Sequence, residues 1–95
     1  MDPVIGVLTL QFRIPHSMTL KDKRSVVKSL IQRLSNTFNV SVAETGHLDS
    51  VRRAGISVAY IANDKSHVHR VLSKVQQMAE REPDAVLEDI NTEVW

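Results

Sequence analysis

The chain has 95 residues, 42% of them hydrophobic, and this length predicts one domain spanning residues 1–95. It has no cysteine, which excludes a disulfide framework, a thiolate zinc site and a thiol nucleophile. No apolar run approaches the roughly 18 residues that span a bilayer, so we expect a soluble, cytoplasmic protein without membrane contact. The net charge is +1, but residues 1–53 hold eight Lys/Arg against four Asp/Glu, whereas residues 54–95 hold four against seven. The first half is where we expect an anionic partner.

The N-terminal third predicts a strand followed by a helix. Hydrophobic residues alternate with period two over residues 4–14, and Pro15 ends the alternation. Thr19 offers a hydroxyl as N-cap, with Asp22 in the capping-box position three residues later. Apolar residues then recur at helical spacing, so a helix is expected from about residue 20 to residue 37.

The middle of the chain predicts a β-hairpin. Hydrophobic residues alternate again over residues 40–45, and Gly46 ends this segment. A further alternating segment covers residues 54–63. The segment HLDSVRR between them is polar, as expected of the connecting loop.

The C-terminal third predicts a second helix and a final strand. Asn63 or Asp64 can cap the helix, and Pro83 ends its apolar stripe. Residues 85–95 keep a weaker alternation. The resulting order, β-α-β-β-α-β, predicts an α+β fold of the ferredoxin-like type, in which two helices cover one face of a four-stranded antiparallel sheet.

The other face of that sheet is predicted to be uncovered within one chain. Its side chains are small and half apolar, whereas a monomer usually covers such a surface with long charged side chains. A homodimer, or another protein–protein contact through this face, is therefore one candidate function.

A basic cluster at the start of the first helix is the second candidate site. Lys21, Arg24 and Lys28 share one side of this helix, and Lys23 lies within the same run. Cations at a helix N-terminus oppose the helix dipole, which favours a role other than helix stability. The alternative is a solvated helix face that Asp22 partly neutralises.

The hairpin loop is the third candidate. Glu44, His47 and Asp49 form a mixed loop site, and Arg52 with Arg53 adds cations to the basic cluster. The alternative is that Glu44 and Asp49 pair with the two arginines and have only a structural role.

Several chemistries find no support in the sequence. His67 and His69 point about 200° apart on a helix and cannot chelate one metal ion, and no catalytic serine, cysteine or phosphate-binding loop is present, so we expect neither a metal, a cofactor nor an enzyme. An RNA-recognition motif stacks bases on two or three sheet aromatics. Here Phe12 and Tyr60 fall on the helix-covered side, so any RNA contact is expected to be electrostatic.

The segments IGVLTLQF, SMTLKDKRSVVKSL, FNVSVAETGHLD and IANDKSHVHRVL resemble the YlxP-like bacterial family of unknown function. The resemblance implies a ferredoxin-like fold. It also implies a link to RNA or the ribosome, because the family is often encoded beside translation and ribosome-maturation factors. Carried over by position, its characteristic residues are Lys21, Lys23 and Arg24 in the helix and Glu44, His47, Asp49 and Arg53 in the loop. The leading hypothesis is a non-enzymatic module that binds structured RNA or the ribosome.

Overall fold

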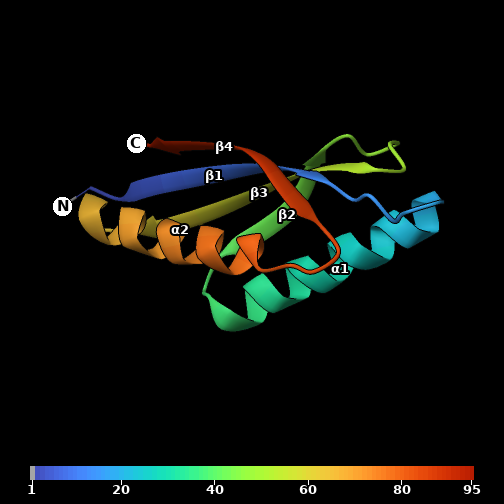
Figure 1. The fold of residues 1–95 in the computed structure, drawn as a ribbon. Helices are drawn as coiled ribbons and strands as arrows, with labels where there is room; N and C mark the ends of the chain where they lie inside the picture. The colour runs from blue at the N-terminus through green and yellow to red at the C-terminus, as the bar shows by residue number, and fades with distance from the viewer. Residues whose placement is uncertain (1) are drawn as a thin grey trace.

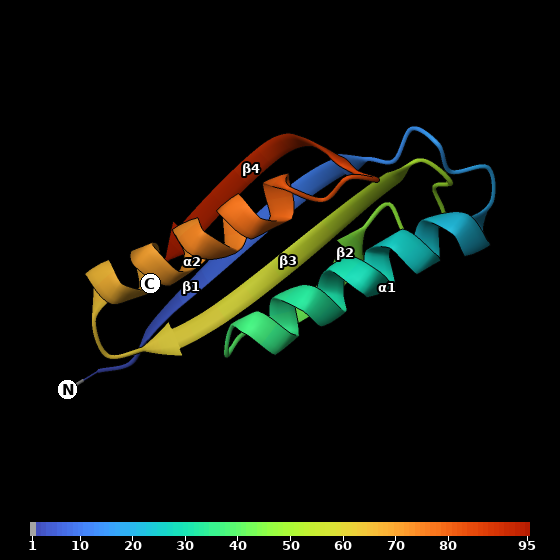
Figure 2. The same cartoon turned by 60° about the horizontal axis from the view of Figure 1, so that its bottom comes forward.

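A computed structural model describes residues 2–95 of the chain. The elements are β1 (Val4–Arg13), α1 (Leu20–Thr37), β2 (Ser41–Gly46), β3 (Arg53–Ala62), α2 (Lys65–Glu80) and β4 (Val86–Val94). The four strands form one antiparallel sheet in the order β2-β3-β1-β4, and both helices lie on the same side of it (Figures 1 and 2). The ferredoxin-like α+β fold predicted from the sequence is confirmed. Among residues 2–95, no helix is both long enough and apolar enough to cross a membrane.

The core lies between the sheet and the helices because the strands bury alternate residues toward α1 and α2. In β1, Leu8, Leu10 and Phe12 are at most 2% exposed. In β3, Ile56 and Val58 are fully buried. The helices meet these strands with the following buried residues: Val27, Leu30 and Leu34 of α1, and Val68, Leu72, Val75 and Ala79 of α2.

A glycine lets α2 approach β1 closely. Gly6 is buried, and a Cβ atom at this position would lie 2.5 Å from Cγ1 of Val68 and 2.7 Å from Cδ1 of Leu72. A side chain here would therefore force the Val68 and Leu72 side chains of α2 to shift from their places against β1.

The face of the sheet opposite the helices is uncovered, and we call it the open face. It consists of Ile5, Val7, Thr9, Gln11 and Arg13 of β1, Ser41, Ala43 and Thr45 of β2, Arg53, Gly55, Ser57, Ala59 and Ile61 of β3, and Asp89, Asn91 and Glu93 of β4. The β4 residues belong to this set because each lies directly opposite an open-face residue of β1, and directly opposed residues share a face. Its hydroxyl groups form a small network: Ser57 Oγ lies 2.6 Å from Thr45 Oγ1 and 3.5 Å from Thr9 Oγ1.

One end of β3 extends beyond its neighbour. Pairing with β2 begins where Ser41 faces Ala59, yet β3 continues to Ala62 and stays paired with β1 throughout. The last residues of β3 therefore have a strand on one side only, among the residues that the structure describes. At the opposite end of the sheet, the loops of residues 14–19 and 47–52 come together beside the start of α1 (Figure 2).

Candidate functional site

The N-terminus of α1 is closed by its own side chains. Thr19 Oγ1 accepts a hydrogen bond from the Asp22 amide at 3.1 Å. Asp22 Oδ2 in turn accepts from the amides of Met18 at 3.0 Å and Thr19 at 3.2 Å. The predicted capping box is confirmed. The capping box thus places the negative charge of Asp22 at this end of the helix, which disfavours binding of an anionic partner by the helix terminus itself.

Three cations project from α1 into solvent. Lys21, Arg24 and Lys28 are exposed, and the seven-residue step from Lys21 to Lys28 corresponds to about 10 Å of helix. Within residues 2–95, none of their charged nitrogens lies within 4.0 Å of a carboxylate oxygen. We call these three residues the basic ridge. Arg33, farther along α1, differs because it pairs with the buried Glu82.

Lys23 does not belong to this surface. Its side chain is fully buried, and Nζ donates to Glu44 Oε2 at 2.6 Å and to the carbonyl oxygens of His47 at 3.0 Å and Leu48 at 3.3 Å. These acceptors satisfy the three N–H donors of the ammonium group. Two residues beyond Lys21, Lys23 is rotated about 200° around the helix, so it points at the β2–β3 hairpin. Its role is to attach α1 to that hairpin.

The hairpin loop is held from inside. Two of its carbonyls bind Lys23, and Ser50 contributes two further bonds, donating its amide to the His47 carbonyl at 3.0 Å and accepting the Arg53 amide at 3.1 Å. His47 has a φ of 56°, in the left-handed region that closes such turns.

The three residues of the predicted loop site do not converge. Glu44 points inward to Lys23, whereas the side chains of His47 and Asp49 are exposed. The alternative pairing of Glu44 with Arg52 or Arg53 is not what the structure shows. Over residues 2–95, no group of three His, Cys, Asp or Glu side chains is arranged to hold a metal ion.

The two loop arginines have separate partners. Arg52 Nε donates to the Ser17 carbonyl at 2.9 Å, so it connects the hairpin loop to the segment before α1. Arg53 lies on the open face, where Arg53 and Arg13 both bind the carboxylate of Glu88, at 3.3 and 3.1 Å. Arg52 is therefore adjacent to the start of α1, while Arg53 is on the other face of the sheet.

Charge is distributed by layer. The two helices contain eight of the twelve Lys/Arg residues and two of the eleven Asp/Glu residues, a net charge of +6. The remainder of the chain contains four Lys/Arg and nine Asp/Glu, a net charge of −5, and β4 alone has three carboxylates and no cation. The imbalance between sequence halves thus becomes, in three dimensions, a basic helical layer and an acidic β4 edge.

A second inward contact was missed in the sequence. His69 is exposed, whereas His67 is half-buried and its Nε2 lies 2.9 Å from the Tyr60 hydroxyl. Arg70 lies 3.4 Å from the other ring nitrogen. The signal for this contact was the position of Tyr60 on the helix-covered face of its strand.

The element order, strand pairing and helix placement define a ferredoxin-like protein. The family described as a protein of unknown function (DUF503) matches residues 5–92, and the chain belongs to that family. It is 28% identical over 81 residues to the uncharacterized protein YlxP of Bacillus subtilis (strain 168), a match that covers 85% of this chain and 88% of YlxP. The resemblance inferred from the sequence is confirmed.

Solved structures share the fold. The de novo designed protein Foldit4 has a TM-score of 0.52 with 9% identity and covers 99% of this chain and 97% of its own. The de novo designed ferredoxin-fold protein LFR1 1 also gives 0.52, with 14% identity and coverages of 96% and 83%. A putative chlorite dismutase, TA0507, matches with a TM-score of 0.52 and 14% identity over 96% of this chain but 43% of its own. At these identities the likeness concerns the fold alone.

Proposed function

We propose that this protein is a small, non-enzymatic module that binds structured RNA, alone or within a ribosome-associated assembly, through the basic ridge of α1. The observation that carries the proposal is the layered charge: the two helices have a net charge of +6, which is still +4 when Glu44 and Glu82, the partners of Lys23 and Arg33, are counted with them (6 − 2). Phosphate contacts supply most of the sequence-independent affinity of nucleic-acid-binding proteins, and Lys and Arg make those contacts. A surface that concentrates exposed cations is the part of this molecule that best fits a polyanion.

The state of the individual cations supports the basic ridge as the contact. Lys21, Arg24 and Lys28 are exposed and have no carboxylate nearby among residues 2–95, so a phosphate would not have to displace an existing ion pair. Lys23 and Arg53 are both paired with carboxylates. These two residues are therefore omitted from the proposed contact. Arg52 stays at its margin, because its guanidinium group lies next to Ser17 and Met18, just before α1.

The open face is a poorer candidate for RNA. It displays small hydroxyl and alkyl side chains, and its β4 edge carries Asp89 and Glu93. Phe12 is buried and Tyr60 is hydrogen-bonded to His67, so among residues 2–95 the one exposed aromatic ring on this side of the sheet is that of Trp95, fewer than the two or three rings on which an RNA-recognition motif stacks bases. The proposed RNA contact is thus electrostatic and is made by the helical side of the molecule.

Binding to a ribosomal RNA fragment across a salt series from about 50 to 200 mM tests the proposal. For wild type we expect the logarithm of affinity to fall linearly with the logarithm of salt concentration. The variant Lys21→Ala/Arg24→Ala/Lys28→Ala should bind more weakly, with a slope smaller by up to about 2.1–2.7 units, since each lost phosphate contact removes about 0.7–0.9 units. An affinity that is independent of salt, or that the triple variant retains, contradicts the proposal.

Two controls are needed. The first tests whether binding depends on where the cations lie or only on their number, and the second tests whether the triple variant is still folded. Lys21→Ala/Lys28→Ala and Arg13→Ala/Arg53→Ala each remove two cations, but we expect only the helix pair to weaken binding. The triple variant should fold at least as stably as wild type in urea titrations. Alanine has the highest helix propensity, and loss of cations near a helix N-terminus relieves an unfavourable dipole interaction of about 0.3–1 kcal/mol each.

A further inference from the structure

The open face has an apolar row at one end. Ile5 is 41% exposed and lies opposite Ile61, which is 61% exposed. On its other side, Ile5 exchanges two backbone hydrogen bonds with Trp95, at 2.8 and 3.1 Å. Directly opposed residues share a face, so Trp95, which is 63% exposed, continues the row across the sheet. Three large apolar side chains thus lie in line, and solvent contacts all of them.

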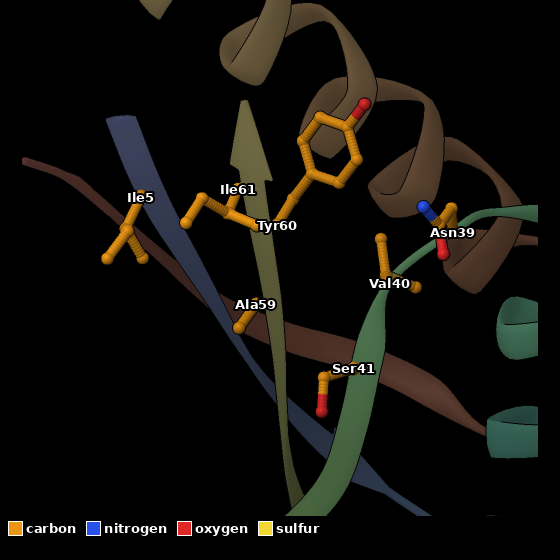
Figure 3. A pocket seen from close by; sticks show the side chains of 7 residues that line it. All are labelled: Ile5, Asn39, Val40, Ser41, Ala59, Tyr60 and Ile61. Carbon is orange, nitrogen blue, oxygen red and sulfur yellow. The ribbon is translucent and has the colours of Figure 1, made fainter. Parts of the chain in front are cut away.

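At the opposite end of this row lies a hollow. Its volume is about 370 Å³, and its lining residues are Ile5, Asn39, Val40, Ser41, Ala59, Tyr60 and Ile61 (Figure 3). It occupies the corner where β3 extends past the start of β2, so the missing strand leaves the space. The order across the sheet is therefore Trp95, Ile5, Ile61 and then the hollow.

We propose that two copies of this chain pair through their open faces, with Trp95 of each copy inserted into the hollow of the other. The geometric reason is the order of the row. A two-fold axis parallel to the strands, between Ile5 and Ile61, exchanges β4 with β2 and leaves each row facing its own equivalent. Ile5 then meets Ile61 of the second copy, and each Trp95 faces a hollow. The surface is complementary to itself, as such a two-fold contact requires.

The charges of the open face favour the same orientation. An axis across the strands would instead place the apolar row over Arg13 and Arg53 of the other copy, which would bury a guanidinium group against isoleucine. With the axis along the strands, Arg13 and Arg53 stay at the far end, where Glu88 already binds them. At that end Arg13 of one copy faces Arg53 of the other, and the Glu88 carboxylates partly neutralise these guanidinium groups.

The available area is sufficient for a weak dimer. The four strands have ten, six, ten and nine residues and lie about 4.8 Å apart, so they offer roughly 550 Å² of flat sheet per copy. Two such faces give roughly 1,100 Å², just below standard interfaces and in the range of weak, transient contacts. Tryptophan is the residue type that most often dominates such contacts, and insertion of its indole ring into a pocket is the usual arrangement. We therefore expect a concentration-dependent dimer.

Trp95 reports on this contact directly because it is the one tryptophan in the sequence. Sedimentation velocity of the full chain, from about 1 to 500 µM, should show a shift from monomer to dimer, and tryptophan emission should move to shorter wavelength over the same range. Trp95→Ala should raise the dissociation constant at least roughly tenfold, as expected for a central tryptophan, and Ile61→Lys should abolish dimerisation. Leu48→Lys is the matched control, because Leu48 is 54% exposed but lies in the hairpin loop. This variant should dimerise like wild type.

A mixture of two defective variants tests the insertion itself. Trp95→Ala lacks the indole but has an open hollow, while Ser41→Arg keeps Trp95 and fills the hollow with an exposed substitution. Neither variant can insert a tryptophan into a hollow when it pairs with itself. In their mixed dimer, Trp95 of Ser41→Arg can enter the open hollow of Trp95→Ala. Trp95→Ala contains no tryptophan, so all the tryptophan emission of the mixture comes from Ser41→Arg. Adding Trp95→Ala should shift this emission to shorter wavelength.

Three results would overturn the proposal. The first is a protein that stays monomeric at about 500 µM, and the second is a dimer that Trp95→Ala and Ile61→Lys leave unchanged. The third is an absence of any spectral shift on mixing. RNA binding through the basic ridge is measured independently, because the ridge is on the opposite side of the molecule.

Discussion

Lys23 and Glu44, twenty-one residues apart in the chain, form an ion pair of 2.6 Å whose lysine is fully buried. The same ammonium group also binds two carbonyls of the hairpin loop. One side chain therefore determines how α1 sits against β2 and how the loop between β2 and β3 turns. Lys23 lies in the middle of a charged run of the sequence, but its role is structural.

Replacement of Lys23 by methionine should destabilise the protein strongly. The change leaves Glu44, 16% exposed at its side chain, and two carbonyls without their donor. Loss of one partner of a buried ion pair costs about 3–5 kcal/mol, and partial exposure of Glu44 favours the lower end. Urea titration measures the change in unfolding free energy. Lys21→Met, at an exposed position of the same helix, should stay within about 0.5 kcal/mol of wild type. A loss below about 1 kcal/mol for Lys23→Met would show that the contact is dispensable.

Replacement of Gly6 by alanine should destabilise by overpacking. The new methyl group would lie 2.5 Å from Val68 Cγ1 and 2.7 Å from Leu72 Cδ1, too close for van der Waals contact. Such overpacking costs about 1–3 kcal/mol. Gly46→Ala is the matched control, because its nearest neighbour outside the adjoining residues would lie 3.6 Å away, an ordinary contact. Thermal unfolding of the two variants should rank Gly6→Ala clearly below Gly46→Ala, and equal midpoints would contradict the packing argument.

Stability should depend on pH through the N-cap of α2. Hydrogen bonds from the Ser66 hydroxyl and the His67 amide lower the pKa of Asp64 below its usual 3.8, with smaller contributions from the charges of Arg70 and His67. A carboxyl with a lowered pKa in the folded state stabilises that state above the pKa of the unfolded chain, and the contribution disappears as pH falls through the folded-state value.

Asp64→Asn removes this titration while keeping a good N-cap. Between about pH 6 and pH 2.5 the stability difference between wild type and Asp64→Asn should therefore shrink, since only wild type loses the contribution. Ser66→Ala, which removes the largest cause of the lowered pKa, should reduce the pH dependence in part. Urea midpoints across the range measure both effects. Parallel curves for wild type and Asp64→Asn would contradict the assignment.

Local patterns in the sequence were enough to predict the fold. Period-two alternation placed β1 and β3, helical spacing placed α1 at residues 20–37, and the capping box of Thr19 and Asp22 fixed where that helix begins. The predicted start of β2 was one residue early, at position 40 instead of Ser41. These features depend on neighbours within a few residues, which a single sequence contains.

The site was harder to predict because its key contacts join distant segments. The helical angle between Lys21 and Lys23 already separated them, but the partner of Lys23 depends on how α1 crosses β2. Period-two alternation puts Glu44 on the same side of β2 as Val42, facing the helices, and this was the usable signal in the sequence. The separate attachments of Arg52 and Arg53 likewise follow from the sheet and loop geometry, not from their adjacency in sequence.

The layered charge also gives the molecule a permanent electric moment, directed from the β4 edge toward the helices. Near any polyanion, that moment exerts a torque that turns the protein before the surfaces touch, so approach occurs preferentially with the helices leading. The trailing sheet would then remain outward-facing and accessible while the leading side is engaged.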